Sequence, residues 1–150
     1  MTIRKGACLC GAVHYTLALD PIAVRVCWCR DCQRLAANGT VNMIVPVDAL
    51  EVRGTLAEFV SQADSGNTMR RRFCPQCGTH LFSHSSGRPQ FVVVRVGTLD
   101  EPSSVHPTTN IWTRSAPAWA CLDTQLDAFA TQPPPPAATR RAVPAIRRGP

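Results

Sequence analysis

The stretch FCPQCGT, residues 73–79, contains the most specific local signal in the sequence. In a Cys-x-x-Cys-Gly loop both sulfur atoms can face one metal ion, backbone N–H groups donate to them, and the glycine accepts the positive φ that closes the turn. Strand-like segments flank this loop at 68–74 and 79–85. The context is typical of a zinc-ribbon knuckle, whereas a redox Cys-x-x-Cys pair is expected at the start of a helix in a βαβ unit. The stretch therefore predicts a zinc site that includes Cys74 and Cys77.

A knuckle supplies two of the four ligands that a structural zinc needs, so a second pair has to come from elsewhere in the chain. The motif ACLCGAV, residues 7–13, offers that pair. In an extended segment residues i and i+2 lie on one side, so Cys8 and Cys10 can reach the same ion, and Gly11 allows the chain to turn. We expect one structural zinc site with four ligands, namely Cys8, Cys10, Cys74 and Cys77.

Three further cysteines lie close together in the stretch RVCWCRDCQR, residues 25–34. They are Cys27, Cys29 and Cys32. Three thiolates with a fourth position left for water or substrate are the arrangement that distinguishes a catalytic zinc from a structural one. The eighth cysteine, Cys121, has apolar neighbours, and we expect it to be a small buried hydrophobic residue rather than a fourth ligand. The spacing also permits other groupings, including a triad that shares ligands with the knuckle.

Length and composition predict a soluble globular protein. With 150 residues, of which 45% are hydrophobic, the chain can bury one core but not two. No apolar run is long enough to span a bilayer, and the N-terminal MTIRKGACLC lacks the apolar stretch of a secretory signal. We therefore predict a cytoplasmic protein without a membrane partner, in which reduced thiols bind metal rather than pair as disulfides.

The charge distribution argues against nucleic acid as a partner, although the net charge is +6. Twelve of the sixteen Lys and Arg residues and all ten acids lie in residues 1–130, which leaves that segment with a net charge of +2. The last twenty residues hold four arginines and six prolines but almost no bulky apolar side chain. Such a segment cannot offset the entropy of ordering, so we expect a zinc-binding domain at 1–130 and a disordered tail at 131–150. The run Arg70 to Arg72 would alternate between strand faces and indicates solvated or charge-balancing side chains.

Short strands separated by turns predict a mostly β fold. The candidate strands are 12–19, 22–28, 40–47, 50–54, 56–63, 68–74, 79–85 and 90–99. The first two could pair as a hairpin across Asp20-Pro21. Residues 30–37 favour one or two helical turns that end at Asn38-Gly39.

Several motifs together resemble one known family. They are GACLCGAVHY, CWCRDCQR, FCPQCGTHLF, VVRVGTLD, and NIWTRSAPAW with a downstream LDAFA. In this order, over roughly residues 4–130, they are similar to the family of glutathione-dependent formaldehyde-activating enzymes and centromere protein V. The resemblance implies a β-tent fold, in which zinc-ribbon-like antiparallel sheets are joined by a structural zinc, with short helical turns and two zinc ions per chain. It also implies that Cys8, Cys10, Cys74 and Cys77 hold the structural zinc, that Cys27, Cys29 and Cys32 hold the catalytic one, and that the activity is that of a carbon–sulfur lyase joining formaldehyde to glutathione.

Two positions depart from the pattern of that family. The family often has histidine where this chain has Trp28, and often has histidine just before the Ile-Trp pair, where this chain has Asn110. The fold and the zinc sites carry over with the cysteines, whereas the substrate does not.

A zinc ion held by three thiolates favours thiol chemistry. A soft cation of this kind accepts a fourth sulfur and holds an incoming thiol as a thiolate near neutral pH. We therefore expect a small thiol partner such as glutathione, or an aldehyde adduct of it. Because the thiolates make the site negative, Arg25, Arg30 and Arg34 are candidates to compensate that charge or to bind a substrate carboxylate. We expect His80, beside the knuckle, to be a hydrogen-bonded structural residue rather than a general base.

The alternative function is a non-catalytic, zinc-stabilised binding module, in which the triad is only a second structural clamp. A fourth protein ligand at the triad, such as Cys121, and the lack of a cleft would favour the module. An open coordination position in a cleft would favour the enzyme.

Overall fold

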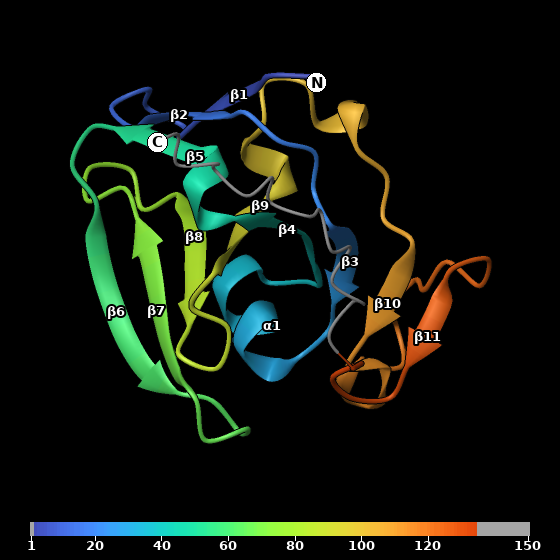
Figure 1. The fold of residues 1–150 in the computed structure, drawn as a ribbon. Coiled ribbons are helices and arrows are strands. Elements are labelled where there is room, and N and C mark those ends of the chain that lie inside the picture. Colours follow the sequence, from blue (N-terminus) through green and yellow to red (C-terminus); the bar gives the residue numbers. More distant parts are fainter. Residues whose placement is uncertain (1, 135–150) are drawn as a thin grey trace, which may run out of the picture.

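Two β-sheets make up most of the computed structural model, which describes residues 2–134 (Figure 1). The smaller sheet has three antiparallel strands in the order β1-β2-β5, which are β1 (Arg4–Ala7), β2 (His14–Leu17) and β5 (Leu50–Arg53). The larger sheet has eight strands in the order β11-β10-β3-β4-β9-β8-β7-β6. Their bounds are β3 (Ala23–Cys27), β4 (Thr40–Pro46), β6 (Ala57–Gln62), β7 (Thr68–Phe73), β8 (His80–Ser85), β9 (Phe91–Arg95), β10 (Thr109–Ile111) and β11 (Asp127–Phe129). The predicted mostly β fold is confirmed.

Helical structure is short throughout the described residues. The α-helix α1 (Arg30–Ala36) occupies the segment for which helical turns were predicted, and its C-cap is Ala37, whose φ is 57°. The left-handed residue that ends the helix therefore comes before the predicted Asn38-Gly39. Four 3₁₀ turns complete the elements: η1 (Val47–Ala49), η2 (Val96–Thr98), η3 (Pro102–Ser104) and η4 (Thr113–Ser115).

The hairpin predicted for residues 12–19 and 22–28 is wrong. β2 pairs with β1 and β5 in the smaller sheet, whereas β3 pairs with β4 and β10 in the larger one. Asp20-Pro21 thus lies where the chain passes from one sheet to the other. The alternation of both segments predicts that they are strands, but alternation does not specify which of several strands becomes the partner.

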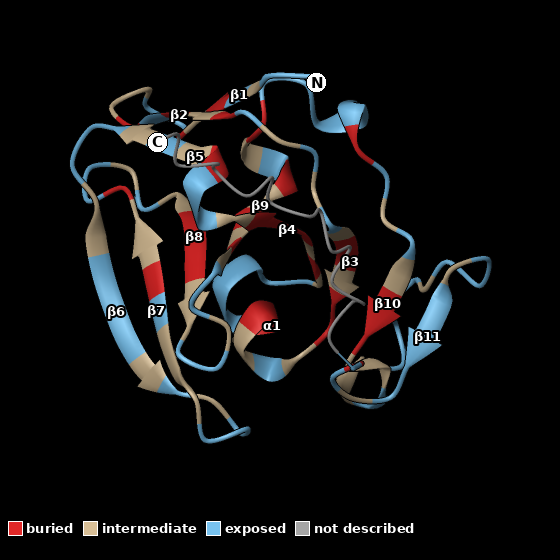
Figure 2. Ribbon diagram, in the orientation of Figure 1, coloured by how far each residue is buried: buried red, intermediate tan, exposed pale blue. Residues whose placement is uncertain are grey.

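The main core lies between the two sheets. In Figure 2 the buried stretches of β4 and β8 belong to it, whereas buried residues of α1 and β10 form a second, smaller cluster. β2 contributes Tyr15 and Leu17, and facing strands of the larger sheet contribute Met43, Phe82 and Val94, all of them at most 2% exposed. The rings of Tyr15 and Phe82 meet edge to face with centroids 5.2 Å apart. Because strand residues alternate between faces, their neighbours in sequence point away from this core, and on β4 and β9 these include Thr40, Asn42 and Arg95. Helix α1 packs on that second face, as the contact of Arg95 with Cys32 shows.

The segment predicted to be a disordered tail is described only at its start. The backbone N–H of Trp112 donates to the carbonyl of Thr131 at 3.3 Å, and Pro133 is buried. The rest of that segment, residues 135–150, lies outside the described residues. Within the described part of the chain, no helix has the length and apolar character needed to cross a membrane.

Candidate metal centres

The four cysteines predicted to form a structural site lie together. The sulfur atoms of Cys8, Cys10, Cys74 and Cys77 are all within 4.8 Å of one another. The Sγ of Cys10 is 3.6 Å from that of Cys8 and 3.8 Å from that of Cys74. A tetrahedral zinc with bonds of about 2.3 Å to sulfur separates its ligands by about 3.8 Å. The donor set and its spacing therefore fit a zinc ion.

Local turns give these sulfur atoms their positions. Gly11, with φ 77°, closes the first turn by donating its N–H to the carbonyl of Cys8 at 3.0 Å. Gly78, with φ 73°, does the same for the carbonyl of Cys74 at 2.9 Å, as the knuckle motif predicts. The N–H of Val13 also donates to the Sγ of Cys8 at 3.2 Å. One half of the site thus follows β1 and the other lies between β7 and β8, so the site joins the two sheets.

Thr79 links the two halves of this four-cysteine site directly. Its Oγ1 accepts the N–H of Leu9 at 3.0 Å and lies 3.1 Å from the Sγ of Cys77. Because the hydroxyl accepts from Leu9, its own proton is free to point at the sulfur. The hydrogen bond from Leu9 holds the turn that contains Cys8 and Cys10 against the turn that contains Cys74 and Cys77.

The second cluster is the triad predicted to form a catalytic site. The sulfur atoms of Cys27, Cys29 and Cys32 lie within 4.8 Å of one another, apart from the four-cysteine site. Cys27 ends β3, Cys29 is the N-cap of α1, and Cys32 is in the first turn of the helix. The Sγ of Cys29 caps the helix by accepting the N–H of Cys32 at 3.4 Å. Cys27 and Cys32 are buried, whereas Cys29 is half-buried.

Gln33 anchors the helix that carries two cysteines of the triad. Its Nε2 donates to the carbonyl of Trp28 at 2.7 Å and to the carbonyl of Ser115 at 2.8 Å. Ile111 and Trp112 pack against the same cluster. The triad is therefore enclosed by the end of β3 and the start of α1, which are neighbours in sequence, and by the distant residues at the end of β10.

Cys121 does not join the triad. Within the described residues, the metal-binding group at the triad contains only the three cysteines. Cys121 is exposed, so its prediction as a buried hydrophobic residue is wrong. Its neighbour Trp119 is 68% exposed as well. An apolar stretch in sequence does not show whether other elements cover it, and here they do not.

Arg95, at the end of β9, is the residue of this site that the sequence did not reveal. Its Nη1 is 3.9 Å from the Sγ of Cys32, although the two residues are 63 positions apart. Of the arginines predicted to serve the triad, Arg25 is buried with its Nη1 unpartnered, Arg30 donates to Gln33, and Arg34 is exposed. The only available signal was a single arginine after the apolar run FVVV, which is unusual in a buried strand.

His80 is held in a neutral state between Arg95 and the backbone. Its Nε2 lies 3.1 Å from the carbonyl of Phe82, and its Nδ1 lies 3.3 Å from Nη2 of Arg95. Burial, together with the charge of Arg95, lowers the pKa of His80 to about 4. The neutral ring then donates from Nε2 and accepts at Nδ1, which is the structural role expected of this residue.

The run Arg70 to Arg72 alternates between faces as predicted. Arg70 and Arg72 pair with Glu58 at 2.7 and 3.1 Å. Arg71 points to the other face, is buried, and places its Nη2 2.6 Å from the carboxylate of Asp31. Since Asp31 lies in the first turn of α1, this ion pair fastens the helix to β7.

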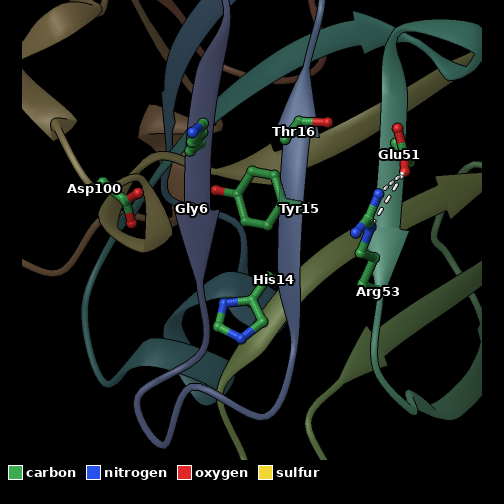
Figure 3. Close-up of a pocket in the computed structure, with 8 residues that line it drawn as sticks. Gly6, His14, Tyr15, Thr16, Glu51, Arg53 and Asp100 are labelled. Atoms are coloured by element: carbon green, nitrogen blue, oxygen red, sulfur yellow. Dashed lines mark hydrogen bonds and ion pairs between the residues drawn. The ribbon is translucent and has the colours of Figure 1, made fainter.

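Two hollows are candidates for a ligand. The one beside the triad has a volume of about 320 Å³ and is lined by Leu35, Ala36, Gly39, Thr40, Val41, His80, Arg95 and Gly97. The other, of about 460 Å³, lies over the smaller sheet (Figure 3), and no cysteine lines either hollow. Its most prominent polar pair, Glu51 and Arg53, forms an exposed ion pair. We assign the chemistry to the first hollow, because Arg95 belongs both to its wall and to the surroundings of Cys32.

These features define a mostly β protein with one cluster of four cysteines and one of three, both suited to zinc. The family model described as glutathione-dependent formaldehyde-activating enzyme matches residues 3–115, a span that includes all seven clustered cysteines. The chain belongs to this family, which confirms the resemblance drawn from the motifs. A Rhodobacter sphaeroides protein with a crystal structure is similar, with 28% identity and a TM-score of 0.53 over 69% of this chain and 91% of that chain. No curated protein matches the chain.

Proposed function

We propose that this protein is a zinc-dependent carbon–sulfur lyase that acts on the adduct of a small thiol and an aldehyde. The observation that carries the proposal is the triad, which has three sulfur ligands and a hollow beside it. The family description, with its reference to glutathione and formaldehyde, supports a hemithioacetal of the glutathione type as the substrate.

The two cysteine clusters have different roles in this proposal. Cys8, Cys10, Cys74 and Cys77 hold a structural zinc, and Cys27, Cys29 and Cys32 hold a catalytic one. When bound at the triad, zinc would supply a position for a fourth sulfur and hold a substrate thiol as the thiolate near neutral pH. The half-buried Cys29 leaves one side of the cluster accessible, while Cys27 and Cys32 keep water from the other.

Breakdown of the hemithioacetal to aldehyde and thiolate needs no further reactant. The hydroxyl group of the hemithioacetal gives up its proton to solvent, and the oxygen–hydrogen electron pair becomes the second bond of the aldehyde carbonyl. The carbon–sulfur bond breaks, and its electron pair stays on the sulfur as a thiolate. The reverse sequence joins the aldehyde to the thiol. Arg95 favours the thiolate side through its positive charge near Cys32.

The state of the cysteines supports a reducing compartment. Seven of the eight lie in two clusters that fit metal ions, and oxidation would destroy these clusters. Thiols remain reduced in the cytosol, where glutathione is also abundant. We therefore propose the cytoplasm as the location.

The binding-module alternative is less well supported. It predicted a fourth protein ligand at the triad, and its best candidate, Cys121, is exposed and outside the cluster. It also predicted no cleft, whereas a hollow of about 320 Å³ shares Arg95 with the surroundings of the triad.

The activity is tested by following exchange between free formaldehyde and its glutathione adduct by NMR. We expect the zinc-loaded protein to speed both formation and breakdown of the adduct. Cys29→Ser serves as the control without a complete triad, and Cys121→Ser as the control that leaves both clusters intact. If the wild-type protein carries two zinc ions per chain and exchange still proceeds at the uncatalysed rate with glutathione and with other small thiols, the lyase proposal is wrong.

A further inference from the structure

The contacts of Arg95 are unusual for a partly buried arginine, because none of them is a carboxylate. Its guanidinium contacts the hydroxyls of Thr40 at 3.1 Å and Ser83 at 3.5 Å, and the ring of His80 at 3.3 Å. It also donates to the side-chain oxygen of Asn42. All four partners are neutral, His80 included, because burial and the charge of Arg95 hold the pKa of that ring at about 4.

Of the ten other arginines in the described part of the chain, five form an ion pair with an acid. Arg25 is also buried without one, but it makes no hydrogen bond to a triad sulfur. Arg71, on the same face of the larger sheet, is the best comparison, since it is buried and pairs with Asp31 at 2.6 Å. The ion pairs of the described residues also include Arg4, Arg53, Arg70 and Arg72, but not Arg95. A cation held away from water without a counter-ion is destabilising in general. The neighbour of Arg95 that can carry negative charge is the Sγ of Cys32, at 3.9 Å.

The triad, in contrast, would carry excess negative charge when it holds a metal. Three thiolates around a divalent cation leave a net charge of −1, and a substrate thiolate would make it −2. No other arginine makes a hydrogen bond to a triad sulfur within the described residues. Among the described residues, Arg95, which has no acid beside it, therefore lies next to the triad, whose excess negative charge has no other arginine beside it.

We propose that Arg95 is the counter-charge of the three-cysteine centre, which raises the affinity of this centre for a divalent metal. The proposal rests on the proposed function in that the triad must bind the metal. Arg95 acts here as a positioning and electrostatic residue and is not itself a catalytic group. Thr40, Asn42, His80 and Ser83 hold the guanidinium against Cys32 without neutralising it, which explains why all four are uncharged.

Zinc affinity at fixed pH, measured by chelator competition, tests this role. The four-cysteine site serves as the internal reference. We expect Arg95→Gln to weaken the triad by roughly 10- to 100-fold, the range typical of lost outer-shell partners, and to leave the reference site unchanged. Arg95→Lys, which retains the charge, should lose much less. Equal losses for the two variants would overturn the proposal, since geometry rather than charge would then be responsible.

Asn42→Asp provides a test that keeps Arg95 in place. One oxygen of the new carboxylate would occupy the position of the amide oxygen that already accepts from Arg95, so it would neutralise the guanidinium. The hydroxyl of Thr40, which accepts from the amide nitrogen of Asn42 at 2.9 Å, can donate to the other oxygen instead. We expect weaker zinc binding at the triad, similar to that of Arg95→Gln. A purely structural Arg95 would be held more firmly in this variant, and unchanged or tighter zinc binding would contradict the proposal.

Arg71→Gln is the matched control for packing. It removes a buried arginine that contacts α1, but one whose charge Asp31 already balances. We expect it to affect the triad less than Arg95→Gln does, and an equal loss would mean that displacement of α1 explains both. A normal affinity in Arg95→Gln, in a wild-type background with two zinc ions and lyase activity, would overturn the counter-charge role alone. Failure of the wild-type triad to bind zinc would overturn both proposals.

Discussion

Replacing Cys74 with serine is expected to unfold the protein. Cys74 is fully buried, and its cluster connects residues 64 positions apart, Cys10 and Cys74, one beside each sheet. A structural zinc contributes on the order of 10 kcal/mol to folding, which is comparable to the entire stability of a typical domain. The circular dichroism of Cys74→Ser should therefore lose its β signal, and the protein should lose zinc from both centres.

Cys121→Ser is the control for this substitution. It removes one thiol from an exposed position outside both clusters, so its zinc content and melting temperature should match those of the wild type. A soluble, folded Cys74→Ser variant that retains two zinc ions would contradict the assignment of the four-cysteine site.

Cys29→Ser is expected to abolish activity while the fold remains. The triad lies within one short segment, so its metal closes a short loop and restricts the unfolded chain far less than the four-cysteine site does. Helix α1 is also held independently, by Gln33 through two backbone carbonyls and by the ion pair between Asp31 and Arg71. We expect the variant to lose one of two zinc ions and its exchange activity, with a native-like circular dichroism spectrum.

Cys10→Ser is the matched comparison, because it also removes one ligand of one cluster. It should unfold the protein, as Cys74→Ser does. If Cys29→Ser and Cys10→Ser both unfold, the triad is a second structural clamp, and the lyase proposal loses its main physical support.

The cysteine turns and the triad were predictable because their signals are local, whereas the pairing of Cys8 and Cys10 with the knuckle followed from the four ligands that a structural zinc needs. The Cys-x-x-Cys-Gly loop fixes its own turn, and the positive φ at Gly11 and Gly78 follows from closing such turns. The spacing of Cys27, Cys29 and Cys32 brings three sulfurs together through one strand end and one helical turn. These features depend on a few neighbouring residues, and the structure retains them.

What the sequence did not predict depends on contacts between distant segments. β2 and β3 lie in different sheets because each pairs with other strands, and the alternation of a strand does not specify its partners. β10 and β11 are three residues each and add to the larger sheet in parallel, too short for a period of two to be visible. Neighbours in sequence also did not reveal Arg95: Arg30 and Arg34 flank the triad in the chain, but the arginine that contacts a triad sulfur comes from β9.

The central claim is that the triad is an open, thiol-binding metal centre. Its most direct test replaces zinc with cobalt in the full chain and follows the absorption bands of the metal during titration with glutathione. We predict one centre with four sulfur ligands that does not respond, and a second that changes from three sulfur ligands to four as one equivalent of thiol binds. S-methylglutathione, which has no free thiol, should leave both centres unchanged. Two centres that already have four sulfur ligands before glutathione is added, and do not respond to it, would contradict the account.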